Sequence, residues 1–522
     1  MSLSPRTWLV PVLIALLGWL LISRENDDPG EFILANNRSS LLLTTTPQRL
    51  LDIDDALVSE SNPARTDGTF DHERCARLHN YLVAFGWMAH HERGVEDLHE
   101  LLSQPSFFEL ERYEGQVPMN RLNPGLIYFL QSIILPTPGG GLFYWVSDVV
   151  IHPADEYFYP FEDNNSAKKE HFVILHISWS EIGSHNIGLV IDQKRNQVAM
   201  PIAIENLESI APIHEHLDMW FPLETMLTNW IHMLRIGKVT ASSPEKEYPP
   251  SNARLGSWVW QSYSPAQVDS AVEAMDRLSA AIEARMPPGS HLSVSRELPL
   301  LTDAELDAAS IPENCFIRSL LTRVKMPRFK FIAPGLEVPH DAAAFVARQK
   351  FTGLPRDPES GTVVPPVLIF ASGKRTINFN KEIRWLFFTA HDPVPYTDRD
   401  RVPVGLYSES SWLVGYEVAE EGFRLLLPYN LRPDNWDSRG ARRSDGSFVS
   451  PGSVSELFQH GCYRPFGGEW RAQRFERLMD RWRELVESGV WKVGKNGVKG
   501  NIDKFQDADY GDWKDYWIPP GW

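Results

Sequence analysis

Imidazole and carboxylate side chains, which carry out acid–base chemistry near neutral pH, are concentrated in residues 171–192. This stretch reads HFVILHISWSEIGSHNIGLVID. Two apolar segments flank a polar turn, and this pattern predicts a β-hairpin that would gather the polar side chains in one place. The candidate acid–base residues are His176, Glu181, His185 and Asp192, with Ser178 beside them. The alternative interpretation is a tight turn with polar caps and histidines that lie in the core.

A second candidate group is the thiol of Cys315, which lies in residues 311–339. A cysteine nucleophile needs a base and a group that orients this base, and His185 with Asp192 would complete such a triad. The opposing interpretation is that Cys315 is an inert, buried residue, which is the more frequent role of a free cysteine.

Basic side chains follow Cys315 closely and are candidates for binding a phosphate-bearing substrate or nucleic acid. They are Arg318, Arg323, Arg328 and Lys330. A second basic series, Arg471, Arg474, Arg477, Arg481 and Arg483, lies along the helix expected at residues 468–488. For both series the alternative is ordinary solvated surface charge. The net charge of −17 argues against non-specific binding of nucleic acid, because neutralisation of phosphates supplies most of that affinity.

Metal-binding residue types occur in the sequence, but their spacing does not match known ligand patterns. The segments 214–216 (HEH) and 90–92 (HHE) have no motif such as HExxH. The three cysteines, Cys75, Cys315 and Cys462, fit neither a zinc site nor a disulfide framework. We therefore expect neither a metal nor a cofactor.

The most apolar segment of the chain is Trp8–Ile22, WLVPVLIALLGWLLI, between Arg6 and Arg24. It is short for a bilayer span of about 20 residues, and it lacks the small residues of a cleavage site. We expect a single-pass anchor in an endomembrane, and the flanking charges leave the side of the body undetermined. The sequons at Asn37 and Asn164 are candidate glycosylation sites if the body is lumenal.

Strand-like and helix-like patterns alternate along the rest of the chain, which predicts a mixed α/β (α+β) globular body behind the membrane helix. Ser264 and Gln267 form a capping box for a helix over residues 265–286. Apolar runs predict strands at residues 172–177, 187–191, 367–370, 385–388 and 423–427. The expected regions are an anchor (1–25), a polar tether (26–70), an α/β region with the hairpin (71–290), and an α/β region with the C-terminal helix and aromatic tail (291–522).

Several long segments resemble a large family of filamentous-fungal proteins. They are ILHISWSEIGSHNIGLVID, ENCFIRSLLTRVKMPRFKFIAPGLEVP, FRLLLPYNL and WKVGKNGVKGNIDKF. The resemblance extends to the arginine-containing cyclodipeptide synthases of secondary metabolism, which take arginine from its charged tRNA and close a diketopiperazine. These synthases carry a DDxxE motif, whereas Asp54-Asp55 is followed here by Ala-Leu-Val, so no residue is carried over from that motif.

The resemblance implies a membrane-tethered biosynthetic transferase that uses an aminoacyl-tRNA. Under this interpretation, residues 311–330 would face the tRNA and residues 171–192 would supply acid–base groups. One alternative is a hydrolase or acyltransferase built on Cys315 and His185. The other is a membrane-anchored scaffold without enzymatic activity. The oligomeric state is not determined by the sequence.

Overall fold

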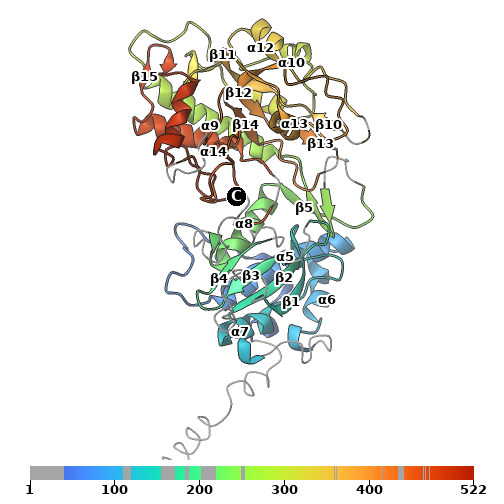
Figure 1. Ribbon diagram of the computed structural model, residues 1–522. Helices are drawn as coiled ribbons and strands as arrows, with labels where there is room; N and C mark the ends of the chain where they lie inside the picture. The colour runs from blue at the N-terminus through green and yellow to red at the C-terminus, as the bar shows by residue number, and fades with distance from the viewer. Residues whose placement is uncertain are drawn as a thin grey trace, which may run out of the picture.

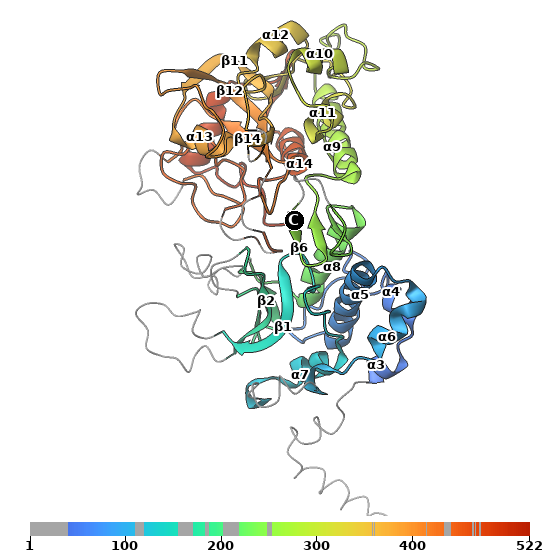
Figure 2. The same ribbon diagram turned by 90° about the vertical axis from the view of Figure 1, so that its right-hand side faces the viewer.

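The computed structural model shows two lobes, with the end of the chain between them (Figures 1 and 2). Three of the expected site residues, Asn37, Asn164 and His185, fall outside the described part of the chain, as does the expected anchor Trp8–Ile22. The described residues are 40–109, 119–154, 171–182, 187–201, 219–247, 253–357, 359, 361–413, 415–432, 440–461, 464, 466–468 and 471–522.

The first lobe, at the bottom of Figure 1, packs helices against a four-stranded antiparallel sheet in the order β1-β2-β3-β4. A three-stranded sheet, β5-β7-β6, lies toward the second lobe. The helices are α3 (Ser40–Thr44), α4 (Pro47–Leu51), α5 (His72–His91), α6 (Leu98–Leu102), α7 (Pro124–Ser132) and α8 (Leu223–Arg235). The strands are β1 (Val146–Pro153), β2 (Phe172–Ser178), β3 (Leu189–Asp192), β4 (Gln197–Ala199), β5 (Val239–Ala241), β6 (Ala253–Leu255) and β7 (Trp258–Trp260).

The second lobe is built on a seven-stranded sheet in the order β14-β12-β11-β9-β8-β16-β15, in which only β8 and β16 are parallel. Strands β10 and β13 form a separate pair. The helices are α9 (Pro265–Glu283), α10 (Asp303–Ala308), α11 (Phe316–Leu321), α12 (Ala342–Arg348), α13 (Lys381–Phe387) and α14 (Phe475–Glu487). The strands are β8 (Phe331–Ala333), β9 (Leu336–Glu337), β10 (Thr362–Val364), β11 (Leu368–Asn378), β12 (Arg401–Ser408), β13 (Ser411–Trp412), β14 (Phe423–Leu426), β15 (Val493–Gly494) and β16 (Gly497–Val498).

Local sequence signals explain several of these elements. The capping box of α9 is present, with Ser264 Oγ accepting from the N–H of Gln267 at 3.2 Å and the Gln267 side chain accepting from Ser264 N–H at 3.1 Å. The strand expected at residues 385–388 is wrong, because this stretch belongs to α13. Asn380 caps that helix by accepting from Ile383 N–H, and helical spacing buries Ile383 and Phe387.

The mixed α/β, α+β character expected of the body is confirmed by this arrangement of elements. One large apolar core belongs to each lobe, and α9 lies in the second core although residues 71–290 were expected to form one region. Among the described residues, no helix is long and apolar enough to cross a bilayer.

The lobes are joined by residues 416–421, which we call the junction loop. It belongs to the second lobe and accepts hydrogen bonds from aromatic side chains of the first. Trp145 Nε1 donates to Glu417 Oε1 at 2.6 Å, and Trp260 Nε1 donates to the carbonyl of Val418 at 2.7 Å. Because both indole rings are buried, these bonds fix the two lobes against one another without intervening solvent.

Candidate functional site

The hairpin expected at residues 171–192 forms, but its register separates the polar residues that it was expected to gather. Strands β2 and β3 are antiparallel, with His176 opposite Leu189 and Asp192 opposite Phe172. Phe172, the partner of Asp192, lies four residues before His176 on β2, which is about 13 Å at the usual rise of a strand. The expectation that both residues share one neighbourhood is wrong.

His176 lies in the core of the first lobe, against His79 of α5. The two imidazole centroids are 5.3 Å apart, and both side chains are fully buried. Burial lowers the pKa of His79 to about 4, and burial together with His79 lowers the pKa of His176 well below its usual value. Both rings are therefore neutral core residues at neutral pH, which is the alternative given above for the histidines.

Asp192 closes the turn that follows β3. Its carboxylate accepts from the N–H groups of Lys194 and Arg195 at 2.9 and 3.3 Å, and it pairs with His171 Nε2 at 3.5 Å. Burial lowers the pKa of His171, while the Asp192 charge opposes this shift. Asp192 thus serves as a buried turn cap. Glu181, at the opposite end of the hairpin, is exposed and accepts from Ser180 Oγ at 3.0 Å.

Cys315 lies in the core of the second lobe, whereas Asp192 belongs to the first. Its thiol is buried and donates to the carbonyl of Pro312 at 3.2 Å. Burial raises the pKa of Cys315 to about 11, so the thiol stays protonated at neutral pH. The triad with Asp192 is therefore not assembled, and Cys315 is an inert core residue at the N-terminal end of α11.

The basic residues after Cys315 do not form an unpaired basic face. Arg318 is buried and pairs with Asp303 and Asp307 at 3.0 and 2.6 Å. The other two arginines are also paired, Arg323 with Asp269 and Arg328 with Glu283. Each of these three charges is therefore paired within the same lobe, and none of the three residues lines the pocket in which Lys330 lies.

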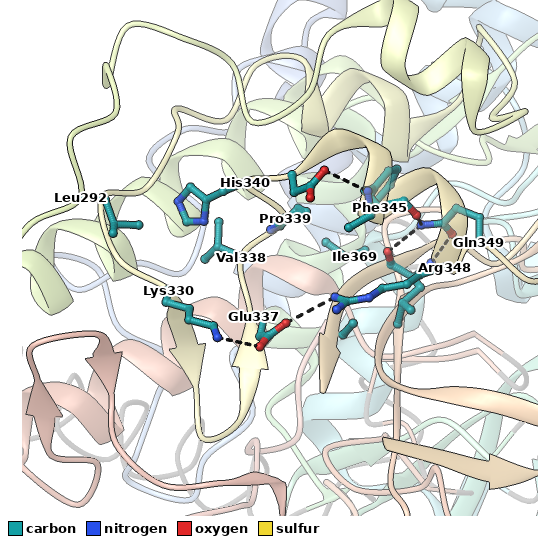
Figure 3. A pocket seen from close by; sticks show the side chains of 14 residues that line it. Leu292, Lys330, Glu337, Val338, Pro339, His340, Phe345, Arg348, Gln349 and Ile369 are labelled. Carbon is teal, nitrogen blue, oxygen red and sulfur yellow. Dashed lines mark hydrogen bonds and ion pairs between the residues drawn. The ribbon is translucent and has the colours of Figure 1, made fainter. Parts of the chain in front are cut away.

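Lys330, the last of the basic residues, has a different setting, because it lines a cavity of about 350 Å³ in the second lobe. Figure 3 shows this pocket between α12 and the strands β8, β9 and β11. Its lining consists of Leu292, Lys330, Glu337, Val338, Pro339, His340, Asp341, Ala344, Phe345, Arg348, Gln349, Leu368, Ile369 and Ala371.

One wall of the pocket carries three charges in a row (Figure 3). The carboxylate of Glu337 lies between two cations, Lys330 Nζ at 3.1 Å and Arg348 Nη1 at 3.4 Å. Glu337 itself is 19% exposed, whereas the side chains of Lys330 and Arg348 are 51% and 35% exposed. Lys330 and Arg348 therefore keep N–H donors that a ligand can reach, and the carboxylate of Glu337 holds these two side chains in place.

The remaining walls are shaped by short polar contacts and apolar side chains. Asp341 caps α12 by accepting from Ala344 N–H at 3.0 Å. Gln349 bonds to both backbone groups of Leu368 and so holds the end of α12 against β11. The His340 ring nitrogen Nε2 lies 2.8 Å from the carbonyl oxygen of Pro327. Val338, Phe345 and Ile369 supply apolar surface.

Lys330 was expected as a site residue from the sequence, whereas Glu337, His340 and Arg348 were not. They lie on a β-hairpin, on the loop after it and at the end of a seven-residue helix. A signal for α12 was present in Asp341 followed by AAAFVAR, an N-cap before a helical segment. No local pattern indicates that this helix packs beside β9 and β11.

Within the described residues there is no group of three or more His, Cys, Asp or Glu side chains that could hold a metal ion. Comparison of the chain with profiles of known protein families, with curated proteins and with solved structures finds no match. The fold and the pocket therefore define the protein only as a two-lobed α+β protein with a cavity of the size that small-molecule sites have.

Proposed function

We propose that the protein is a biosynthetic enzyme whose pocket beside α12 binds an amino acid or a similarly small, doubly charged substrate. The observation that carries this proposal is the charged row Lys330–Glu337–Arg348 in a cavity of about 350 Å³. Sites for small molecules combine a largely apolar lining with a few fixed polar groups, and this cavity has both.

The charged side chains that line the pocket are complementary to a zwitterion, which has one positive and one negative group. Lys330 and Arg348 offer donors to a substrate carboxylate, and Arg348 has the planar geometry that favours carboxylate binding. Asp341, on the same lining, offers a carboxylate to an ammonium or guanidinium group. The apolar surface of Val338, Phe345 and Ile369 would bury the aliphatic part of the substrate.

Arginine is the substrate that the resemblance to cyclodipeptide synthases suggests, and it has both charges. It could enter the pocket as the free amino acid or as the residue esterified to tRNA. The second route belongs to the proposed transferase activity. Arg318, Arg323 and Arg328 are ion-paired and do not line the pocket, so they make no direct contact with a substrate bound there. Tethering of the body to an endomembrane through Trp8–Ile22 is part of the same proposal.

The first test is calorimetric titration of the full chain, in detergent, with free L-arginine and separately with arginyl-tRNA. The variant Arg348→Met removes the guanidinium that would donate to the substrate carboxylate, and Glu337→Gln tests separately whether the carboxylate between the two cations is needed to position them. Hydrogen bonds to charged groups contribute about 1.5–3 kcal/mol, so we expect affinity to fall by about 10- to 100-fold. The matched control is Glu297→Gln, an exposed residue of the same lobe.

The second test concerns the reaction itself. A fungal host that expresses the full chain is compared by untargeted mass spectrometry with a host that expresses Arg348→Met. A new arginine-containing diketopiperazine, present only with the unchanged chain, supports the transferase. Binding of arginine without a new product would favour a non-enzymatic binding or scaffold role, and no binding of either ligand would overturn the proposal.

A further inference from the structure

A second group of buried basic residues lies at the junction of the lobes, on the segment that leads into α14. Arg471 and His460 are each 3% exposed, and the side chain of Arg474 is 12% exposed. Burial lowers the pKa of Arg471 to about 9, opposed by Glu417 and reinforced by Arg464 and Arg474. A buried guanidinium of this kind is costly unless charges or hydrogen bonds compensate it.

The hydrogen bonds of Arg471 are incomplete. Its Nη1 donates to the carbonyl of Gly467 at 2.7 Å, but its Nε and Nη2 have no partner among the described residues. The guanidinium lies between two indole rings, 5.7 Å from the centroid of Trp145 and 5.0 Å from that of Trp522. The rings hold the guanidinium in place without using its N–H groups.

Two residues beside Arg471 also have buried N–H donors without a partner in the part of the chain that is described. Nε of Arg474 and Nε1 of Trp522 are also buried donors without a partner in the described chain, and Arg474 lies over the same Trp522 ring, at 4.9 Å. Nε2 of His460 is unpartnered as well, and burial together with Arg471 and three other arginines lowers its pKa well below the usual value. The unpartnered guanidinium and indole nitrogens can only donate, so the group lacks an acceptor rather than a donor.

The backbone before Arg471 leaves room for this arrangement. Gly467 and Gly468 have φ values of 95° and 104°, a region that side chains rarely adopt. A Cβ on Gly468 would collide with Nη1 of Arg471, and one on Gly467 would collide with the Trp145 ring. The glycine pair therefore allows the guanidinium to pack against its own backbone at the junction.

The nearby carboxylates are already engaged. Glu417 accepts from Trp145 Nε1 at 2.6 Å, and Glu476 pairs with Arg474 Nη1 at 2.8 Å. Arg477 is partly buried and donates to Gln473 and to the carbonyls of Pro519 and Gly521. Arg474 also donates from Nη2 to the carbonyl of Trp522, so its remaining buried donor is Nε, while Arg471 retains Nε and Nη2.

We propose that Arg471 and Arg474, with the indole N–H of Trp522, form a binding site for the phosphate group of a soluble small molecule between the lobes. A phosphate offers several acceptor oxygens and at least one negative charge, which matches guanidinium groups arranged around a common ring. The site is separate from the pocket beside α12, so it does not depend on the function proposed for that pocket.

The test is calorimetric titration of the full chain with inorganic phosphate and with pyrophosphate, against sodium chloride at equal ionic strength. We expect saturable binding that Arg471→Gln weakens at least tenfold. Arg474→Lys is a second variant that keeps the charge but loses the planar donors, and it should also weaken binding. Arg399→Gln, which changes an exposed arginine of the same lobe, should bind phosphate as the unchanged chain does.

Three outcomes would overturn the proposal. The first is phosphate binding no stronger than the chloride control. The second is unchanged affinity in both Arg471→Gln and Arg474→Lys, with folding verified by circular dichroism. The third is loss of phosphate binding in Lys330→Met with none in Arg471→Gln, which would assign the anion to the pocket beside α12 instead.

Discussion

At the scale of single residues, burial decides which ionisable groups can take part in chemistry. His79, His176 and Cys315 have side chains that often catalyse reactions, but each is enclosed in a core. Desolvation makes both imidazoles very weak bases and keeps the thiol protonated, and enclosure in a core keeps all three side chains away from a substrate. Lys330 and Arg348, by contrast, remain accessible at the pocket.

The buried pair His79–His176 makes stability depend on pH. The pKa of His79 is about 4 in the folded chain and 6.5 in the unfolded chain, so the unfolded chain binds more protons between these values. The stabilisation is complete above pH 6.5 and is lost as pH falls toward 4. At pH 5 the loss from His79 alone is about 2 kcal/mol.

Chemical denaturation of the unchanged chain and of His79→Gln at pH 7.5 and pH 5.0 measures this effect. The variant should lose about 2 kcal/mol less on moving to pH 5.0, because one titrating group is gone. Equal losses in both proteins would show that His79 is not the group responsible.

At the scale of elements, the arginines of α14 form hydrogen bonds to the backbone of a later segment of the same chain. Arg481 donates to the carbonyls of Asp515 and Lys514 at 3.1 and 2.6 Å, and Arg477 donates to that of Pro519 at 2.6 Å. The arginines on this side of α14 therefore bind residues 509–522, the aromatic tail (DYGDWKDYWIPPGW), rather than facing solvent. Among the described residues, Arg483 pairs with Asp480 and Glu487 of the same helix.

Replacing Arg481 by methionine should loosen the tail. The change removes charged hydrogen bonds that contribute about 1.5–3 kcal/mol each, so hydrogen exchange in residues 513–518 should speed up by tenfold or more. Arg483→Met, on the same helix, is the matched control and should leave the exchange of the tail unchanged. Equal exchange in the two variants would contradict the role assigned to Arg481.

The elements also show what could be predicted from the sequence. The capping box at Ser264 is a local signal, and α9 begins at Pro265 as this signal predicts. The Asn380 cap was a local signal too, but the apolar run after it was interpreted as a strand. His79 and His176 are brought together only by packing of α5 on β2, which depends on long-range contacts that local patterns do not encode. Glu337 and Arg348 are likewise brought together by long-range packing, which places α12 beside β9.

At the scale of the whole molecule, the lobes are joined by a buried ion pair. Lys238 follows α8 in the first lobe, and its Nζ lies 2.9 Å from Glu421 of the junction loop. Both side chains are almost fully buried, and Lys238 Nζ also donates to the carbonyls of Ser262 and Val418. Burial lowers the pKa of Lys238, and the neighbouring Glu421 opposes this shift.

Removing one partner of this pair should destabilise the protein strongly. Lys238→Met leaves Glu421 buried without its counter-charge, and such changes cost about 3–5 kcal/mol. The double variant Lys238→Met/Glu421→Gln removes both charges and should recover part of that loss. Denaturant unfolding of the three proteins measures the coupling, and additive losses in the double variant would contradict it.

The aromatic tail has a consequence for how the chain is made. The core of the first lobe, built mainly from residues 50–260, also contains the side chains of Phe466 and Trp522. On the ribosome this core stays incomplete until more than 200 further residues have emerged, which takes roughly 10 to 50 s at ordinary rates of synthesis. During that interval apolar surface of the first lobe is uncovered, so the nascent protein should depend on chaperones longer than the order of its lobes would suggest.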